Sequence, residues 1–318
     1  MRTKSQKHHL LILSQHDEIY KQLIEQEVLP GLSCTAAKDP HEIIKSGDEF
    51  NIVFGEPSLI SKVLNSITSI RWVQSTWAGV EPLLAPGLRQ DYLLTNARNV
   101  YGQAMAEYVF GYLLMIERQV LPRWQSQLAG RWDNRLSGTL RDKVLGLLGV
   151  GSIGSHLADI AHKFDMQVYG YTRQSEVCQS VDQYFHGDGL YEFASTLDYL
   201  VCSLPGTSAT KKLIDESFLS ALPARVWLLN IGRGSTLDEE ALVRALNSHR
   251  LSGAVLDVYS EEPLPPGHPL WSTPNTFITF HTAAQNYPPD IARIFINNYK
   301  RYIEGQPLLF QVDFKLGY

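Results

Sequence analysis

Few cysteines and no long apolar run occur in this chain, and both absences exclude whole classes of protein. Only three of its 318 residues are cysteines, and Cys34, Cys178 and Cys202 lie far apart. This number and spacing provide neither a disulfide framework nor a zinc motif, so we expect reduced thiols and no metal site. The longest uncharged apolar run, residues 108–116, is less than half of the roughly 20 residues that a membrane span needs.

A strong charge of either sign is also absent. The chain has 28 basic and 33 acidic residues, which gives a net charge of −5 at pH 7. Electrostatic binding to nucleic acid or to an anionic membrane is therefore not expected. A secretory signal peptide is not expected either, because only a short apolar block at residues 10–13 follows the first basic residues. These features together predict a cytoplasmic protein.

The chain is long enough for about two domains, and 44% of its residues are hydrophobic. Short apolar runs alternate with amphipathic stretches along it. Strands are expected at residues 9–13, 51–54, 71–75, 143–148, 167–171, 225–231, 252–259 and 276–280, and helices at 18–28, 103–118 and 287–304. Alternating strands and helices predict an α/β fold with parallel sheets. The mixed stretch at 119–139 could cross between two domains.

A glycine-rich turn follows the strand at residues 143–148. Its sequence is Gly149-Val150-Gly151-Ser152-Ile153-Gly154, and an amphipathic helix and a second strand come next. The first glycine allows a tight turn, the second lets the backbone approach a pyrophosphate, and the third lets the helix and strand pack closely. The helix N-terminus would offer free N–H groups to the phosphates. This context predicts a dinucleotide-binding Rossmann unit, and a purely structural turn is the alternative.

The acidic residue that usually holds the ribose, about 20 positions after such a turn, is missing here. The second strand ends instead at Tyr171-Thr172-Arg173. An acidic side chain would repel a 2′-phosphate, whereas Thr172 and Arg173 could bind one by hydrogen bond and charge. The sequence therefore favours NADP(H), with NAD(H) possible. The alternative is that Arg173 is a solvated surface charge and that either cofactor is accepted.

Three polar residues, Arg233, Glu262 and His281, each lie just past the end of a predicted strand. The carboxyl ends of parallel strands line the ligand crevice of a doubly wound sheet. Each residue taken alone also has a structural interpretation, and it is their shared placement beside a cofactor fold that favours a functional one. Thr236 and Glu239 are expected to form a capping box that opens the helix after Arg233.

The chemistry of these three side chains suits hydride transfer to a 2-keto acid. The reaction needs a cation for the substrate carboxylate and carbonyl oxygen, and Arg233 has the planar fork that matches a carboxylate. It also needs an acid for the forming alkoxide, and the imidazole of His281 fits this role. Glu262 would keep that imidazole protonated and oriented. The cofactor carries the hydride, so no metal is needed.

Several segments together resemble the D-isomer-specific 2-hydroxyacid dehydrogenase family over nearly the whole chain. They are residues 148–154, 202–214, 230–234, 256–264 and 281–284. The resemblance implies that Arg233 is the catalytic arginine, Glu262 the catalytic glutamate and His281 the acid/base histidine. It also implies that Asp257 contacts the nicotinamide carboxamide. Further cofactor contacts are implied for Leu204, Pro205, Thr210 and Ile231.

The same resemblance implies how the domains are organised. A smaller flavodoxin-like substrate domain would comprise residues 1–99 and 285–318, and the Rossmann domain, residues 100–284, would be inserted in it. Residues 74–80 resemble the loop whose backbone amides hold the substrate carboxylate, with Trp77, Ala78 and Gly79 at the substrate. A core or interface tryptophan is the alternative for Trp77. Family members are typically dimers joined through the cofactor domain, so a homodimer is expected.

Departures from the family pattern refine the expected function. Phe280 stands where the family often has Pro, and Glu81 where the loop usually has Asp. Val312-Asp313 with Gly317-Tyr318, like Thr172-Arg173, resembles the glyoxylate/hydroxypyruvate reductase branch, which prefers NADPH. The expected activity is NADPH-dependent reduction of small 2-keto acids to D-2-hydroxy acids. The alternatives are a nucleotide-sensing binding protein of the corepressor type and a dehydrogenase of another small anion, such as phosphite.

Overall fold

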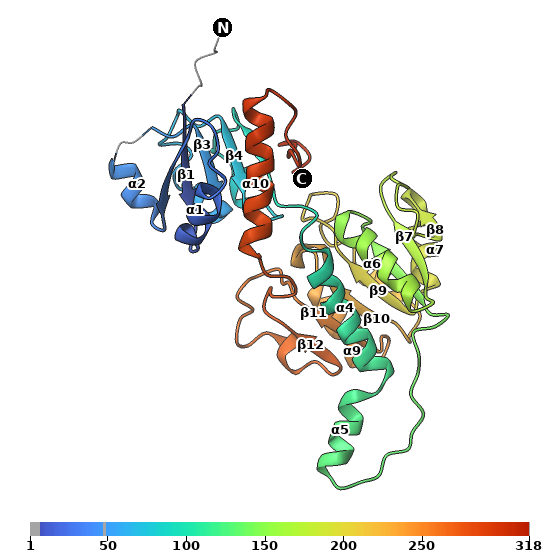
Figure 1. Cartoon of the computed structure of the whole chain (residues 1–318). Coiled ribbons are helices and arrows are strands. Elements are labelled where there is room, and N and C mark those ends of the chain that lie inside the picture. The colour runs from blue at the N-terminus through green and yellow to red at the C-terminus, as the bar shows by residue number, and fades with distance from the viewer. Residues whose placement is uncertain (1–6, 47–48, 318) are drawn as a thin grey trace. The chain divides into compact units, whose positions relative to one another are not determined.

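The computed structural model describes residues 7–46 and 49–317, so Tyr318 lies outside the described residues. The chain divides into two compact units (Figure 1). The smaller unit is Met1–Val100 with Asn286–Tyr318, and the larger unit is Tyr101–Gln285. Each unit contains one sheet in which every pairing between neighbouring strands is parallel. This confirms the expected α/β class.

The smaller unit has a five-stranded sheet of order β2-β1-β3-β4-β5, which is the flavodoxin-like order. Its elements are β1 (His8–Leu13), α1 (Asp17–Glu25), β2 (Leu32–Ala37), α2 (Pro40–Ser46), β3 (Ile52–Gly55), α3 (Pro57–Ile60), β4 (Trp72–Ser75), η1 (Glu81–Leu84), β5 (Leu93–Thr95) and α10 (Pro288–Ile303). The inner strands β1 and β3 are nearly continuous apolar runs because helices cover both faces of such a sheet, whereas the edge strand β2 alternates partly buried and exposed residues. Phe295 of α10 stacks on Trp72 of β4, with ring centroids 5.2 Å apart.

The larger unit has a seven-stranded sheet of order β12-β11-β10-β9-β6-β7-β8. Its elements are α4 (Gly102–Glu117), α5 (Val120–Leu128), β6 (Val144–Leu148), α6 (Ser152–Lys163), β7 (Gln167–Tyr171), β8 (Gln183–Phe185), η2 (Gly187–Gly189), α7 (Leu190–Ser195), β9 (Tyr199–Cys202), α8 (Glu216–Ala221), β10 (Trp227–Asn230), η3 (Gly234–Thr236), α9 (Glu239–Asn247), β11 (Gly253–Leu256), η4 (Pro269–Ser272) and β12 (Thr276–Ile278). The chain winds outward from β6 in one direction and from β9 in the other. This doubly wound Rossmann topology opens a ligand crevice at the carboxyl ends of these two strands.

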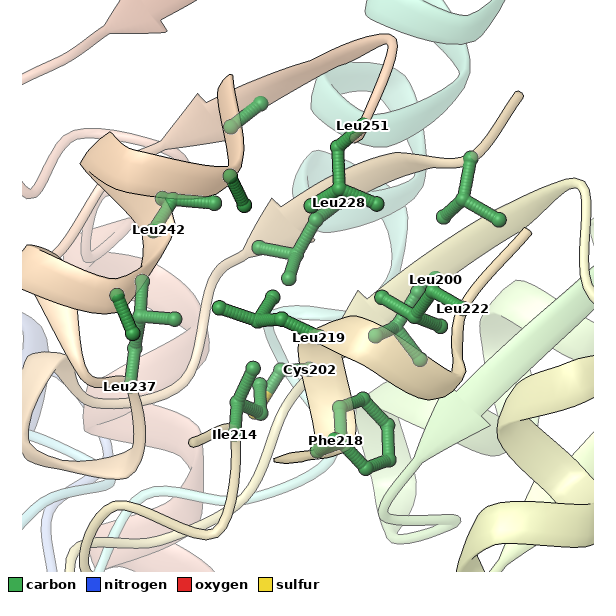
Figure 2. Close-up of a cluster of buried hydrophobic side chains, with 14 of the residues drawn as sticks. Leu200, Cys202, Ile214, Phe218, Leu219, Leu222, Leu228, Leu237, Leu242 and Leu251 are labelled. Atoms are coloured by element: carbon green, nitrogen blue, oxygen red, sulfur yellow. The ribbon is translucent and has the colours of Figure 1, made fainter. Parts of the chain in front are cut away.

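Alternate residues of the central strands of this sheet enter two different cores. Leu228 packs toward α8 and α9, in the cluster that Figure 2 shows with Leu200 and Phe218. Leu229 packs on the opposite face, with the residues of α4 and α6. Successive strand side chains point to opposite faces, so an unbroken apolar run is what a sheet covered on both sides requires. The carboxyl ends of the strands are thereby held on a rigid support.

Two expectations about the larger unit are wrong. Residues 119–139 do not cross between units; they form α5 and an extended segment within the larger unit. The Thr236–Glu239 capping box does not form, because Asp238 is the N-cap of α9 and accepts from the Ala241 N–H at 3.1 Å. Thr236 is fully buried, and its hydroxyl donates instead to the Arg233 carbonyl at 2.7 Å.

Among the described residues, none of the helices combines the length and the apolar character that crossing a bilayer demands.

Candidate active site

The turn between β6 and α6 has the backbone geometry that its glycines predict. Gly149 has φ +95°, a region that residues with a side chain rarely adopt. A Cβ on Gly154 would lie 2.4 Å from the Gly149 carbonyl oxygen, so any side chain there would push α6 away from the turn. Ser203, which follows β9, donates its hydroxyl to the same carbonyl at 3.1 Å. The turn therefore holds α6 close against the ends of β6 and β9.

The first turn of α6 offers an anion site that fits a dinucleotide phosphate. The amides of Ser152, Ile153 and Gly154 find no acceptor among the described residues. Gly151 is the N-cap and provides no side chain, and a Cβ built on it would meet open space. Unsatisfied N–H groups and the positive end of a twelve-residue helix together attract phosphate. This part of the chain fits the pyrophosphate of NAD or NADP.

Thr172 and Arg173 lie at the carboxyl end of β7, where the ribose residue of a Rossmann fold is found. Thr172 is buried, and its hydroxyl donates to the Ser175 carbonyl at 2.7 Å. Its oxygen also lies 3.1 Å from Nδ1 of His186. Arg173 is exposed. The Thr172 hydroxyl thus holds the loop that follows β7, while Arg173 projects from it.

The other expected cofactor residues follow β9 and β10. Leu204 and Pro205 are half-buried just past β9, and the Ile231 N–H donates to the carbonyl of Cys202 at 3.0 Å. Thr210 donates its hydroxyl to the Pro205 carbonyl at 2.6 Å. All four residues thus lie in segments at or after the carboxyl ends of β9 and β10, and the Thr210 hydroxyl fixes the shape of the loop after β9.

Arg233 lies on a turn whose backbone is bonded by two buried side chains, Asn230 and Thr236. Asn230 is fully buried; its Nδ2 donates to the Arg233 carbonyl at 3.2 Å, and its Oδ1 accepts from the Gly232 N–H at 3.2 Å. The Thr236 hydroxyl donates to the same carbonyl. The Arg233 guanidinium is half-buried, and its Nη1 donates to the Gly232 carbonyl at 2.8 Å. The Arg233 carbonyl is therefore held by bonds that do not involve the guanidinium.

His281 and Glu262 form a pair in the larger unit. Nδ1 of His281 lies 2.8 Å from Oε2 of Glu262, and Oε1 of Glu262 accepts from the Tyr259 N–H at 3.0 Å. Because an ionised carboxylate only accepts hydrogen bonds, Nδ1 carries the proton of this contact. The His281 side chain is about half exposed (51%). This geometry leaves Nε2 as the atom available for proton exchange with a substrate.

Asp257, at the end of β11, holds the loop that carries His281. Its Oδ1 accepts from the Thr279 hydroxyl at 2.5 Å and from the Thr282 N–H at 2.8 Å, and its Oδ2 accepts from the Ala283 N–H at 3.0 Å. The His281 N–H also donates to the Asp257 carbonyl at 2.8 Å. His281 itself has φ +56°, in the left-handed region that residues other than glycine seldom adopt. These bonds keep His281 in that conformation.

Sequence reasoning missed two residues that support this loop, Tyr108 of α4 and Thr279 just after β12. The Tyr108 hydroxyl lies 2.7 Å from Oγ1 of Thr279. Since Thr279 gives its own proton to Asp257, Tyr108 is the donor in this contact. Burial raises the pKa of Tyr108, which keeps the hydroxyl protonated. In the sequence, the only local signal for these two residues would have been a polar side chain next to apolar ones.

In the loop after β4, in the smaller unit, two backbone carbonyls accept hydrogen bonds from neighbouring residues. The Trp77 carbonyl accepts from the Ser75 hydroxyl at 2.9 Å and from the Ala97 N–H, and the Ala78 carbonyl accepts from Asn96 Nδ2 at 2.7 Å. In the part of the chain that the structure describes, the amides of Ala78 and Gly79 have no acceptor. Trp77 is 41% exposed and is not a core residue. The loop can therefore offer two amides to an anion.

Comparison with protein families and known sequences places these features in a wider context. A family model described as "D-isomer specific 2-hydroxyacid dehydrogenase, NAD binding domain" matches residues 110–283. That range is more than half of the chain and contains the glycine turn as well as Arg233, Glu262 and His281. Glyoxylate/hydroxypyruvate reductase A of Klebsiella pneumoniae subsp. pneumoniae is 31% identical over 217 residues, which cover 68% of this chain and 70% of that protein.

Solved structures share the fold over nearly the whole length. A D-isomer specific 2-hydroxyacid dehydrogenase family protein from Aeromonas salmonicida subsp. salmonicida is 38% identical, with a TM-score of 0.91 over 97% of this chain and 99% of that one. A D-isomer specific 2-hydroxyacid dehydrogenase from Xanthobacter autotrophicus, crystallised with NADPH and MES, is 28% identical, with a TM-score of 0.86 over 98% and 100% of the two chains.

Proposed function

Because the chain belongs to the D-isomer-specific 2-hydroxyacid dehydrogenase family, whose members are NAD(P)-dependent enzymes, we propose that it reduces small 2-keto acids of the glyoxylate and hydroxypyruvate type to D-2-hydroxy acids with NADPH. The observation that carries the proposal is the hydrogen-bonded His281–Glu262 pair in the cofactor-binding unit. Such a pair supplies the proton that carbonyl reduction consumes.

A nicotinamide cofactor held by the turn between β6 and α6 would supply the hydride that the substrate carbonyl carbon needs. The carbonyl oxygen gains negative charge as the hydride arrives, and the guanidinium of Arg233 stabilises that charge. Nε2 of His281 then donates its proton to this oxygen and completes the hydroxyl group. Glu262 accepts the hydrogen bond from the Nδ1–H group throughout. The imidazole therefore keeps its orientation both when it is charged and when it is neutral. We assign the Ala78 and Gly79 amides to the substrate carboxylate.

Two observations favour NADPH as the reductant. No acidic side chain ends β7, where Thr172 and the cationic Arg173 stand instead. The relative from Xanthobacter autotrophicus, which is 28% identical to this chain, was crystallised with NADPH. A dianionic 2′-phosphate is best bound where an arginine is present and a carboxylate does not end the strand.

Oxidation of the reduced cofactor tests the proposal directly. Purified protein is mixed with NADPH or NADH and with glyoxylate, hydroxypyruvate or phenylpyruvate, and the loss of nicotinamide absorbance is followed. We expect turnover that is faster with NADPH than with NADH. Turnover with NADH alone would overturn the cofactor assignment but keep the enzyme class. Cofactor binding without turnover of any of these acids would favour the nucleotide sensor or a dehydrogenase of another anion.

We also propose that the chain forms a homodimer through its cofactor-binding unit. In Figure 1, α5 and the extended segment after it project from the rest of that unit. Large apolar side chains are exposed there, including Trp132 at 94% and Leu136 at 95%. Neighbouring Trp124 and Leu128 are also exposed. An exposed apolar segment of this size is typical of a protein–protein interface, and a second copy of the chain would cover it.

Substitution of this segment should therefore change the oligomeric state. We expect wild type to have about twice the 35.8 kDa mass of one chain in size-exclusion chromatography with light scattering. The double variant Trp132→Ser and Leu136→Ser should shift to the mass of one chain. Val28, an isolated apolar residue that is 84% exposed in the smaller unit, provides the control Val28→Ser, which should remain dimeric. A wild-type protein with the mass of one chain would contradict the dimer.

A further inference from the structure

A histidine with a hydrogen-bond acceptor on each ring nitrogen follows β8. Nδ1 of His186 lies 2.9 Å from the Thr172 carbonyl oxygen, and Nε2 lies 2.7 Å from Oε1 of Glu176. Carbonyl and carboxylate oxygens only accept, so both nitrogens must donate. Only the doubly protonated imidazolium can make both bonds. The imidazolium form of His186 satisfies both contacts at once, with the Glu176 carboxylate as its anion.

This ion pair lies at the end of the sheet where adenosine ribose is recognised. The Thr172 N–H donates to the Phe185 carbonyl at 3.1 Å, which joins the ends of β7 and β8. His186 is the next residue after Phe185. Thr172 directly follows the carboxyl end of β7, where Rossmann folds contact the ribose. The cation thus adjoins the residue pair that the sequence assigns to a 2′-phosphate.

Further contacts hold Glu176 within reach of His186. The Tyr184 hydroxyl accepts from the Cys178 N–H at 3.0 Å and donates to the Cys178 carbonyl at 3.1 Å, which fixes the loop after Glu176. The Tyr184 ring also stacks on His186 at an interplanar angle of 10°. The Glu176 carboxylate and the Thr172 carbonyl raise the pKa of His186 above its ordinary value. Nearby in sequence, Arg173, Asp182 and Asp188 are the other charged groups of these two loops, and Asp182 pairs with His162.

We propose that Glu176 and the 2′-phosphate of the cofactor compete for His186, so that this pair sets the preference for NADPH over NADH. The inference rests on the proposed function and extends its cofactor specificity. A phosphate dianion makes stronger charge-assisted bonds than one carboxylate and displaces Glu176 from the imidazolium. The uncharged 2′-hydroxyl of NADH has no charge with which to do so, and Glu176 stays on His186.

Two substitutions should therefore change cofactor affinity in opposite directions. His186→Asn removes the cation but keeps a donor for the Thr172 carbonyl, and we expect the ratio of NADPH to NADH affinity to fall about tenfold. Glu176→Gln removes the competing charge, and the same ratio should rise several-fold. Dissociation constants are measured by calorimetry without keto acid, so the test does not depend on turnover. A protein that turns over no keto acid would fail the proposed function and still test this inference.

His162 provides the matched control. It forms a similar pair with Asp182 at 3.2 Å. This pair lies by the last turn of α6 and the start of β7, where Asp182 accepts from the Val168 N–H, and not at the carboxyl end of β7. His162→Asn should leave the affinity ratio unchanged. Equal weakening of NADPH and NADH binding by His186→Asn would overturn the proposal, as would weaker NADPH binding in Glu176→Gln.

A titration of the histidine side chains by NMR adds an independent readout. In the protein without cofactor, the pKa of His186 should lie above the ordinary imidazole value, because the Glu176 carboxylate and the Thr172 carbonyl favour the charged form. Glu176→Gln should lower it, since the carboxylate is the largest cause of the shift. An unchanged pKa in that variant would show that the two side chains are not paired in solution and would also overturn the proposal.

Discussion

Replacing His281 by asparagine should lower kcat for keto-acid reduction by about 100-fold or more, because the variant has no group that can donate a proton to the forming alkoxide. Asparagine is chosen because it tolerates the left-handed backbone better than most residues, and His281 has φ +56°. The bonds from Asp257 to the loop involve backbone groups and Thr279, so they remain in the variant. The measurement is kcat with saturating NADPH and hydroxypyruvate.

A second histidine in the same backbone region provides the control for this experiment. His249 also has φ +56° and is exposed at the end of α9, so His249→Asn makes the same chemical change without touching the site. We expect its kcat to stay within about twofold of wild type. If His281→Asn retained wild-type kcat, the assigned proton donor would be wrong, whatever the effect of the control.

Local patterns predicted the strands well where the chain is buried on both faces. The prediction at residues 167–171 matches β7 in full, because Val168 packs in one core while Tyr169 and Tyr171 pack against the other. The prediction for β12 extended to residue 280, yet the strand ends at Ile278. Thr279 leaves the strand there because its hydroxyl bonds to Asp257. A contact between residues 22 positions apart has no signature in local periodicity.

One polar support of the site escaped prediction for the same reason, since Tyr108 reaches Thr279 from 171 positions away in the sequence. Asn230 holds the Arg233 turn from only three positions away, but its bonds depend on the conformation of that turn. The residues that were predicted share a simpler property, since each follows a strand and parallel strands end at one edge. Chain position alone thus pointed to Arg233, Glu262 and His281 as candidates, and their roles stay predictions. Tertiary packing decides which carbonyl or carboxylate group each supporting side chain bonds.

Substitution of Arg233 is expected to have an effect of similar size. Arg233→Lys keeps the charge but loses the planar pair of donors, and we expect kcat/KM for hydroxypyruvate to fall by about 100- to 1,000-fold. The turn should survive, because Asn230 and Thr236 bond the Arg233 carbonyl and not its side chain. Arg225, just before β10 at the other end of the same strand, bonds Asp198 at 2.6 Å on the surface. Arg225→Lys makes the same change there and should leave kcat/KM nearly unaltered.

Chemical rescue separates a lost functional group from a displaced turn. In Arg233→Ala, added guanidinium can enter the space of the missing side chain, and it should restore part of kcat/KM in a concentration-dependent way. It should do nothing for His281→Asn, whose defect is the absence of a proton donor. Failure of rescue together with an unchanged melting temperature would mean that Arg233 does not contact the substrate. Rescue with an unchanged KM for NADPH would instead assign the guanidinium to the keto acid, because a cation that held the cofactor would change that KM as well.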